Sequence, residues 1–361
     1  MGRTILLRVS SDASQTNTHV HATLQTPGVF NPYLTNGGHG ADVTASVSDI
    51  TLEDFSISEA SGSYSGFPIA LMAAEDSTIQ RVEVYGVTNH WAITLHGNRL
   101  KAVDNRIDNT GRIYQDGIHY LGGRDSIISR NIIRSGDDAI AISSGGATDP
   151  DIRNILVSDN SLYSSHGHAI RVFQENSSAT NQFEGLRFVN NSGVGGFNRN
   201  GIIRFHSAST NQTYPLRDIS VSKSAFQMGT FADHNSDINQ GGFGAYVEDC
   251  QGLRFDNVTL GATIWESFRI IDCDDVTLSE CEAVGATYSA FFNNTVRLEN
   301  VRRLSVYGGD YRNYYGYGAQ VFAMANVGTA RFAGVFLSNT VAGGGVIGAF
   351  SNSFAVAPGM F

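Results

Sequence analysis

Three aspartates in two short phrases are the residues of this chain best suited to acid–base chemistry. Asp116 follows Gln115, and Asp137 and Asp138 are adjacent in the phrase Gly136-Asp137-Asp138. Each phrase runs from a turn into a short apolar segment. Three carboxylates on one patch repel one another, so such a patch is expected to have a function. Mutual repulsion raises the pKa of one carboxyl group and keeps it protonated, as a general acid requires.

Basic side chains recur in the segments around and after these aspartates. The residues that we interpret as their neighbours are His119, His168, Arg171, Arg204 and His206. We expect His168 to act with the aspartates in catalysis, and His119, Arg171, Arg204 and His206 to bind substrate. One Asp pair alone is more simply read as a solvated turn. Matched positions in successive segments favour a site.

A metal or cofactor is not predicted. The three aspartates could be mistaken for a Ca²⁺ site, but hydrolysis by carboxylates needs no ion. His19, His21 and His39 lie near the N-terminus without companion carboxylates at ligand spacing. Cys250, Cys273 and Cys281 are too few for a disulfide framework, and we read the first two as stacked thiols in neighbouring coils.

Short segments of alternating apolar residues recur along the whole chain and indicate a repeat. The step from Leu100 to Ile127 is 27 residues, and the next step, to Ile155, is 28. Later steps lengthen to 31 at Leu186 and 33 at Ile219. Coils that differ in loop length explain this drift, with three short strands and three turns in each coil. Stacking in register then brings distant residues onto one line.

An asparagine recurs at one place in four successive repeats, at positions 105, 131, 160 and 191. Asn tolerates the left-handed backbone of a sharp turn, and stacked Asn side chains can hydrogen-bond to one another. Such a column is typical of a right-handed parallel β-helix. We therefore predict an all-β chain, a right-handed parallel β-helix of about 10–11 coils.

Composition agrees with a single β-rich domain over residues 1–361. The chain has 40 Gly, 6 Pro and 16% charged residues, and no pattern of a long amphipathic helix. We expect residues 1–47 to form irregular first coils or the remnant of an N-terminal cap, and residues 211–243 to form a long loop. Net charge is −10, so a nucleic-acid partner is not expected. No apolar stretch spans a membrane, and no signal peptide is visible.

The phrases around the central residues resemble the motifs of glycoside hydrolase family 28, the polygalacturonases and their relatives. Gln115-Asp116-Gly117 is similar to the first motif of that family, and Gly136-Asp137-Asp138 to the second. Gly167-His168-Ala169 is similar to the third motif, and Arg204-Phe205-His206 to the fourth. The resemblance covers the middle of the chain, and elsewhere the likeness is that of the fold.

The resemblance implies a polysaccharide hydrolase that inverts the sugar. Asp137 would be the general acid, Asp116 and Asp138 would position and deprotonate the water, and His168 would support the acid's protonation. Arg204 would bind the sugar at the cleavage point. We expect all five side chains on one face of the helix, with acid and base about 6.5–9.5 Å apart.

His206 stands where family 28 has a lysine that grips galacturonate. Because a neutral His leaves Arg204 as the one fixed positive charge, we expect a neutral or sparsely charged glycan. Depolymerases of virus tailspikes, which reuse this kind of site, fit the same pattern. The protein is then extracellular or virion-associated, and a homotrimer if a tailspike, otherwise a monomer. Two alternatives stay open, a β-helix lyase or uronate epimerase, and a non-catalytic fibre or carbohydrate-binding protein.

Overall fold

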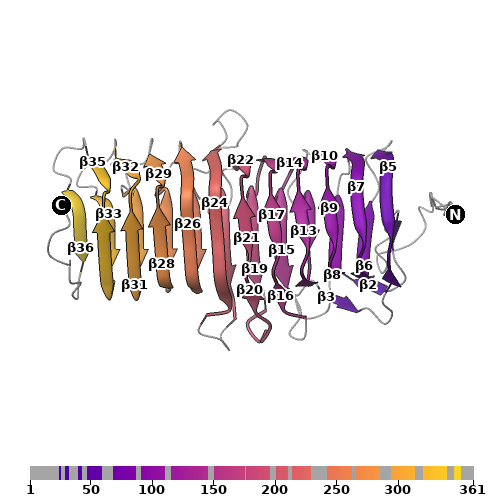
Figure 1. Cartoon of the computed structure of the whole chain (residues 1–361), viewed down its shortest axis with the longest axis horizontal. Helices are drawn as coiled ribbons and strands as arrows, with labels where there is room; N and C mark the ends of the chain where they lie inside the picture. The colour runs from indigo at the N-terminus through magenta and orange to yellow at the C-terminus, as the bar shows by residue number, and fades with distance from the viewer. Residues whose placement is uncertain are drawn as a thin grey trace.

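The computed structural model describes residues 24–25, 29–31, 40–42, 47–58, 68–86, 91–109, 115–144, 150–174, 176–195, 201–209, 214–228, 242–261, 263, 265–284, 294–313, 320–339 and 345–350. These residues form strands, bends and turns, and include no helix. A search of the same residues for a helix able to cross a membrane finds none. Figure 1 shows the strands stacked side by side along one long axis, from the N-terminal end to the C-terminal end.

One strand from each coil joins the first sheet. Its strands, in order, are β1 (Leu24–Gln25), β6 (Ile69–Glu75), β8 (Ile93–Asn98), β11 (Ile118–Tyr120), β15 (Ile140–Ser144), β19 (Ile170–Gln174), β23 (Ile203–Ser207), β25 (Ala245–Glu248), β27 (Phe268–Ile271), β30 (Val296–Glu299), β33 (Gln320–Ala325) and β36 (Gly345–Phe350). Neighbours along this path pair in parallel, as coils of a solenoid do. β4 (Val47–Ser48) also pairs with β6.

The second sheet receives the remaining strands of each coil. They are β5 (Thr51–Ser58), β7 (Thr78–Tyr85), β9 (Lys101–Val103), β10 (Arg106–Asn109), β12 (Gly123–Arg124), β13 (Ile127–Ser129), β14 (Ile132–Ser135), β16 (Ile152–Arg153), β17 (Leu156–Ser158), β18 (Ser161–Ser164), β20 (Phe183–Glu184), β21 (Arg187–Val189), β22 (Ser192–Gly195), β24 (Leu216–Met228), β26 (Cys250–Gly261), β28 (Asp274–Ser279), β29 (Glu282–Val284), β31 (Arg303–Tyr307), β32 (Asp310–Asn313), β34 (Thr329–Ala333) and β35 (Phe336–Asn339). A separate antiparallel pair joins β2 (Val29–Asn31) to β3 (Gly40–Asp42).

The core lies between the sheets and is built from columns of like residues. Ile118 pairs with Ile140, which pairs with Ile170, which pairs with Ile203, and all four are fully buried. Side chains alternate along a strand, so the residue after each isoleucine points to the outer face of the first sheet. The apolar alternation in the sequence therefore fixes which side chains this outer face presents.

The asparagine column is confirmed as a hydrogen-bonded ladder. Asn105 Nδ2 donates to Asn131 Oδ1 at 3.0 Å, Asn131 Nδ2 donates to Asn160 Oδ1 at 2.9 Å, and Asn160 Nδ2 donates to Asn191 Oδ1 at 2.9 Å. The reason given for the column was partly wrong. The left-handed backbone belongs to the residue before each asparagine, namely Asp104, Arg130, Asp159 and Asn190.

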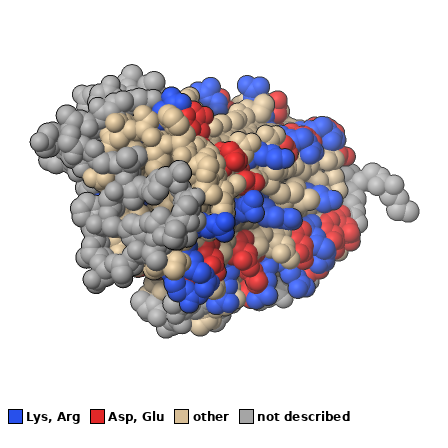
Figure 2. Space-filling view, turned by 60° about the vertical axis from the view of Figure 1, so that its left-hand side comes forward, with Lys and Arg blue, Asp and Glu red and all other residues tan. Residues whose placement is uncertain are grey.

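Exposed charges on the turns pair with one another from coil to coil. Arg99 contacts Glu75 at 2.9 Å and Asp76 at 2.6 Å, and Arg130 contacts Asp104 at 2.8 Å. Figure 2 shows basic and acidic side chains beside one another over much of the face it presents. Exposed pairs of this kind contribute little stability individually.

The expected loop over residues 211–243 is corrected in part. Residues 216–228 form β24, a strand of 13 residues that pairs with β26 over most of its length. The apolar alternation there satisfies the core, which outweighs the polar composition around it. Residues 229–241 lie outside the described residues, as do residues 1–23. Cys250, Cys273 and Cys281 are buried and free, which agrees with stacked thiols.

Candidate functional site

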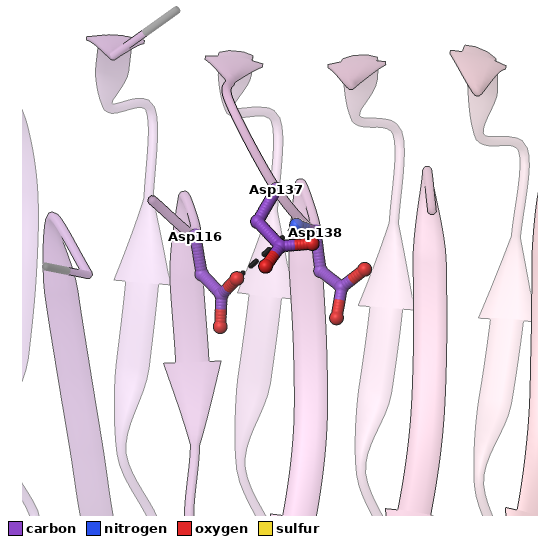
Figure 3. Close-up of side chains that lie close together, drawn as sticks. All are labelled: Asp116, Asp137 and Asp138. Carbon is purple, nitrogen blue, oxygen red and sulfur yellow. Dashed lines mark hydrogen bonds between the residues drawn. The ribbon is translucent and has the colours of Figure 1, made fainter. Parts of the chain in front are cut away.

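The three aspartates meet at the edge of the first sheet. Asp116 comes two residues before β11, and Asp138 comes two residues before β15. Because β11 and β15 pair in parallel from Ile118 and Ile140, these two aspartates occupy equivalent places in neighbouring coils. One oxygen atom from each of Asp116, Asp137 and Asp138 lies within 4.8 Å of the other two. The expectation that they share one face is confirmed (Figure 3).

The nearest oxygens of the three carboxyl groups lie close together. Inverting glycosidases hold acid and base about 6.5–9.5 Å apart to admit a water. Here Asp137 and Asp138 follow one another through a bend, and Asp116 lies one coil away, so the nearest oxygens are no more than 4.8 Å apart. Figure 3 shows the carboxylate of Asp137 between those of Asp116 and Asp138. This bound concerns the nearest oxygens, so the separation of acid and base carboxyl groups stays a prediction.

Asp116 is held through both of its oxygens. The backbone N–H of Asp138 donates to Oδ1 at 3.1 Å, and His119 Nδ1 lies 2.6 Å from Oδ2. His119 Nε2 is 2.6 Å from Ser143 Oγ, and its ring stacks on Trp91 at 3.6 Å. Burial, followed by the charges of Asp138 and Asp137, raises the pKa of Asp116 well above its usual range. Asp116 therefore resists ionisation.

Asp138 has the opposite character. His168 contacts Asp138 Oδ1 twice, through its backbone N–H at 2.8 Å and through Nδ1 at 2.7 Å, and Arg171 Nη1 lies 3.5 Å from Oδ2. Burial opposes ionisation of Asp138, but His168 and Arg171 together outweigh it and lower its pKa. Burial lowers the pKa of His168 despite its contact with Asp138. We therefore assign an anionic Asp138 that accepts a hydrogen bond from a neutral His168.

Two glycines allow neighbouring coils to approach each other closely at the cluster. A Cβ atom on Gly167 would lie 2.6 Å from Asp138 Oδ1 and still closer to Asp137 Oδ1. A Cβ atom on Gly117 would lie 2.5 Å from the backbone oxygen of Ala139. Neither distance is compatible with a side chain unless the neighbours shift. Gly167 is therefore required by the carboxylates, whereas Gly117 is required by the close packing of its coil against Ala139 and the side chain of Ile133.

Arg171 and His206 form a second layer beside Asp138. Arg171 Nη2 lies 3.3 Å from His206 Nε2, and its guanidinium sits 3.8 Å above the Phe173 ring. His206 stacks on the same ring, with centroids 5.9 Å apart. Burial, followed by the charges of Arg204 and Arg171, lowers the pKa of His206 to about 2. His206 is thus a neutral acceptor that orients Arg171.

Arg204 lies next to Arg171 on the outer face of the first sheet, one strand further along. Within the described residues, no hydrogen bond or ion pair joins Arg204 to the aspartates, so it flanks the cluster instead of joining it. The register continues from Arg204 to Tyr246, then Arg269, then Arg297. The expectation that Arg204 would be the one fixed positive charge is therefore wrong. Periodicity within the strands, read one residue past each core isoleucine, could have found this column.

All eight residues selected from the sequence lie in this region of the first sheet. The sequence missed Trp91, which precedes β8, Ser143 on β15 and Phe173 on β19, which reach the same space. The three aspartates are grouped closely enough to hold a metal ion. However, Arg171 and His168 already contact Asp138, and a guanidinium 3.5 Å from Oδ2 opposes a second cation there.

Comparisons with known proteins bear on the fold. Residues 4–154 match the family model described as right handed beta helix region. The chain is a right-handed parallel β-helix. No curated protein matches it by sequence.

Solved structures share this β-helix at low sequence identity. PfbA, a surface adhesin of Streptococcus pneumoniae, is 9% identical, with a TM-score of 0.55 over 87% of this chain and 82% of that one. The A-module of the mannuronan C-5 epimerase AlgE4 from Azotobacter vinelandii is 12% identical, with a TM-score of 0.51 over 86% and 74%. The catalytic unit of a GH87 α-1,3-glucanase from Streptomyces thermodiastaticus is 15% identical, with a TM-score of 0.47 over 88% and 60%. At these identities the likeness of PfbA and of the AlgE4 module concerns the fold alone.

Proposed function

We propose that the protein is a glycoside hydrolase that cleaves a polysaccharide at the cluster of Asp116, Asp137 and Asp138. One observation carries the proposal. Within a single cluster, burial and like charge keep Asp116 from ionising, whereas His168 and Arg171 keep Asp138 ionised. Two neighbouring carboxyl groups with pKa values driven apart are what acid–base catalysis of glycoside cleavage needs.

Each member of the cluster has a separate task in this proposal. Asp137 is the general acid that protonates the glycosidic oxygen, and the protonated Asp116 beside it replaces the proton that Asp137 gives up. Asp138 is the ionised partner, which either activates water or attacks the sugar. His168 and Arg171 hold Asp138 in place, and Asp116 is fixed by His119 at 2.6 Å. The motifs similar to family 28 support this assignment.

The substrate we propose is a polysaccharide that lies along the outer face of the first sheet, outside the cell or at the surface of a virion. An elongated face of stacked strands suits an elongated chain better than a compact ligand. The similar adhesin and epimerase share the fold, and their activities are alternatives that the experiment must separate.

The test is digestion of a panel of neutral and acidic polysaccharides, with products read by mass spectrometry. Hydrolysis adds one water to each cleaved bond, a lyase leaves an unsaturated sugar without added water, and an epimerase leaves the mass unchanged. NMR of the first anomer released distinguishes water activation, which inverts, from attack by Asp138, which retains. Binding without any cleaved product across the panel would reject the hydrolase.

A further inference from the structure

Beyond Arg204, the outer face of the first sheet carries a group of cationic and aromatic side chains that the proposed chemistry does not use. Tyr246 on β25 lies in register between Arg204 on β23 and Arg269 on β27. The guanidinium carbons of Arg204 and Arg269 lie 5.4 Å and 5.5 Å from the centre of the Tyr246 ring. Arg269 also lies 5.2 Å from the ring of Phe243, which packs against Tyr246.

Several polar atoms in this group are buried without a hydrogen-bond partner. They are Nε of Arg204, Nε of Arg269 and both carboxyl oxygens of Glu266. Glu266 is fully buried, and its Oε1 lies 4.0 Å from Nη1 of Arg297. Buried polar groups are nearly always satisfied, because leaving them unpaired costs free energy. The unpaired Nε atoms of Arg204 and Arg269, on the two arginines that flank Tyr246, indicate a place arranged for a ligand.

The charged side chains here are the arginines and the carboxyl groups of Glu248, Glu266 and Glu299, of which Glu248 accepts a hydrogen bond from the Tyr246 hydroxyl. Within the described residues, Arg269 approaches a carboxylate only at Glu299, at 4.0 Å, and Arg204 has no ion pair at all. Burial raises the pKa of Glu266, whose Oε1 lies 4.0 Å from Arg297. Arg297 is less available, because it pairs with Glu299. Guanidinium groups suit a carboxylate or sulfate, which they can bind through two parallel hydrogen bonds.

We propose that Arg269, beside Tyr246, forms a second glycan subsite, which binds an acidic unit of the polysaccharide away from the cleavage point. β27 is four strands from β15 in the first sheet, or about 19 Å at the usual strand spacing. This inference rests on the proposed function, since it takes the ligand to be a glycan lying along this face. The expected substrate is a glycan with acidic units, which Arg269 recognises and His206 does not.

The experiment is a calorimetric titration of the Asp137→Asn protein, because this substitution prevents cleavage. The ligands are polygalacturonate, alginate, dextran sulfate and neutral dextran. We expect Arg269→Gln to weaken binding of at least one acidic polymer about tenfold to a hundredfold, as loss of a charged hydrogen bond does, and to leave dextran unaffected. Arg269→Lys should keep part of the affinity. Comparison of the two carboxylated polymers with dextran sulfate shows which acidic group is bound.

The matched control is Arg254→Gln, which removes one exposed arginine from β26 of the second sheet. Equal losses for Arg269→Gln and Arg254→Gln would reduce the effect to net charge and overturn the subsite. Absence of binding to every acidic polymer would overturn it as well. The wild-type protein could also cleave nothing on the panel and still bind an acidic polymer in a way that depends on Arg269. That result would support the subsite and reject the hydrolase, so the two proposals fail separately.

Discussion

Two columns of polar side chains run along this β-helix, and they differ in how their hydrogen bonds are satisfied. In the asparagine ladder at the turn of the second sheet, neighbouring residues satisfy the hydrogen bonds of each side-chain amide. Asn131 donates to Ala102 and to Asn160, and accepts from the backbone and side chain of Asn105. On the outer face of the first sheet, Arg204, Arg269 and His168 each keep a buried nitrogen without a partner.

This difference distinguishes a column that stabilises the fold from a column that binds or reacts. A ladder in which every side-chain amide has its hydrogen-bond partners contributes to folding and has no free donor or acceptor for a ligand. A face with unpaired buried groups costs free energy, and such costs concentrate where a protein binds or reacts. The same fold therefore carries both kinds of column, each on its own side.

Asp137→Asn is expected to have the largest effect, and it tests the column that we assign to function. If Asp137 is the general acid, turnover of the preferred glycan should fall by about 10²–10⁴-fold, because an amide has no proton to give. The change lies outside the stacked core, so the thermal unfolding temperature should stay within a few degrees. Product formation is followed by mass spectrometry and folding by circular dichroism.

The control for this variant is Asp125→Asn, which removes a carboxylate from an exposed turn of the second sheet. It should leave turnover unchanged. Near-normal turnover in Asp137→Asn would show that the acid lies elsewhere in the cluster, and parallel Asp116→Asn and Asp138→Asn proteins would locate it.

Asn131→Ala tests the other column. The substitution leaves the backbone oxygen of Ala102 and two donors of Asn105 without partners in a buried ladder. Each buried unsatisfied group costs about 1–3 kcal/mol, so we expect a loss of about 3 kcal/mol or more in the free energy of unfolding. Turnover at a temperature where the variant is folded should not change. Denaturant titration measures the first quantity; a loss of turnover without a loss of stability would contradict the separation of roles.

The fold could be predicted from the sequence because its signals are local and repeated. Apolar alternation recurs at one coil's spacing, and Asn105 and Asn131 mark the same turn in successive coils. The grouping of Asp116 with Asp138 followed from that spacing. What the sequence could not supply was distance, because the bend before β15 sets how far Asp137 lies from its neighbours.

The missed residues have a different cause. Trp91 and Phe173 reach the site through packing between coils, and no motif marks them. The arginine column was missed because Arg269 lies far along the chain from the aspartates, although its place after a core residue, Phe268, matches that of Arg171 after Ile170. The residue spacing that predicted the fold would have located it if carried past Arg204.

Gly167→Ala sharpens the assignment of the cluster without touching a titrating group. The new methyl group would approach the carboxylates of both Asp137 and Asp138, which must then move. Since misplacement of a catalytic group by about 1 Å can cost about 10²-fold, we expect turnover to fall about tenfold to a hundredfold. Gly261→Ala is the matched control, because nothing lies within 4 Å of a Cβ atom there. Equal turnover in the two variants would show that the close approach of the carboxylates is not needed.

Asp116→Asn is expected to change the pH dependence of the free energy of unfolding. The pKa of Asp116 is raised in the folded state, so between the unfolded value of about 3.9 and the folded value the folded protein binds more protons. The free energy of unfolding then falls as pH rises, by about 1.4 kcal/mol per pH unit in that interval. Asn cannot titrate, so it removes this slope.

The variant's stability relative to wild type should therefore increase from pH 4 upward and level off above the folded pKa. Asp138, whose pKa is lowered, adds stability that is lost as pH falls. It is present in both proteins, so its effect largely cancels in the difference. Urea midpoints of the two proteins at pH 4, 5, 6 and 7 provide the measurement. A difference that stays constant over this range would mean that Asp116 ionises normally when folded, and the cluster would then lack the retained proton on which the proposed chemistry depends.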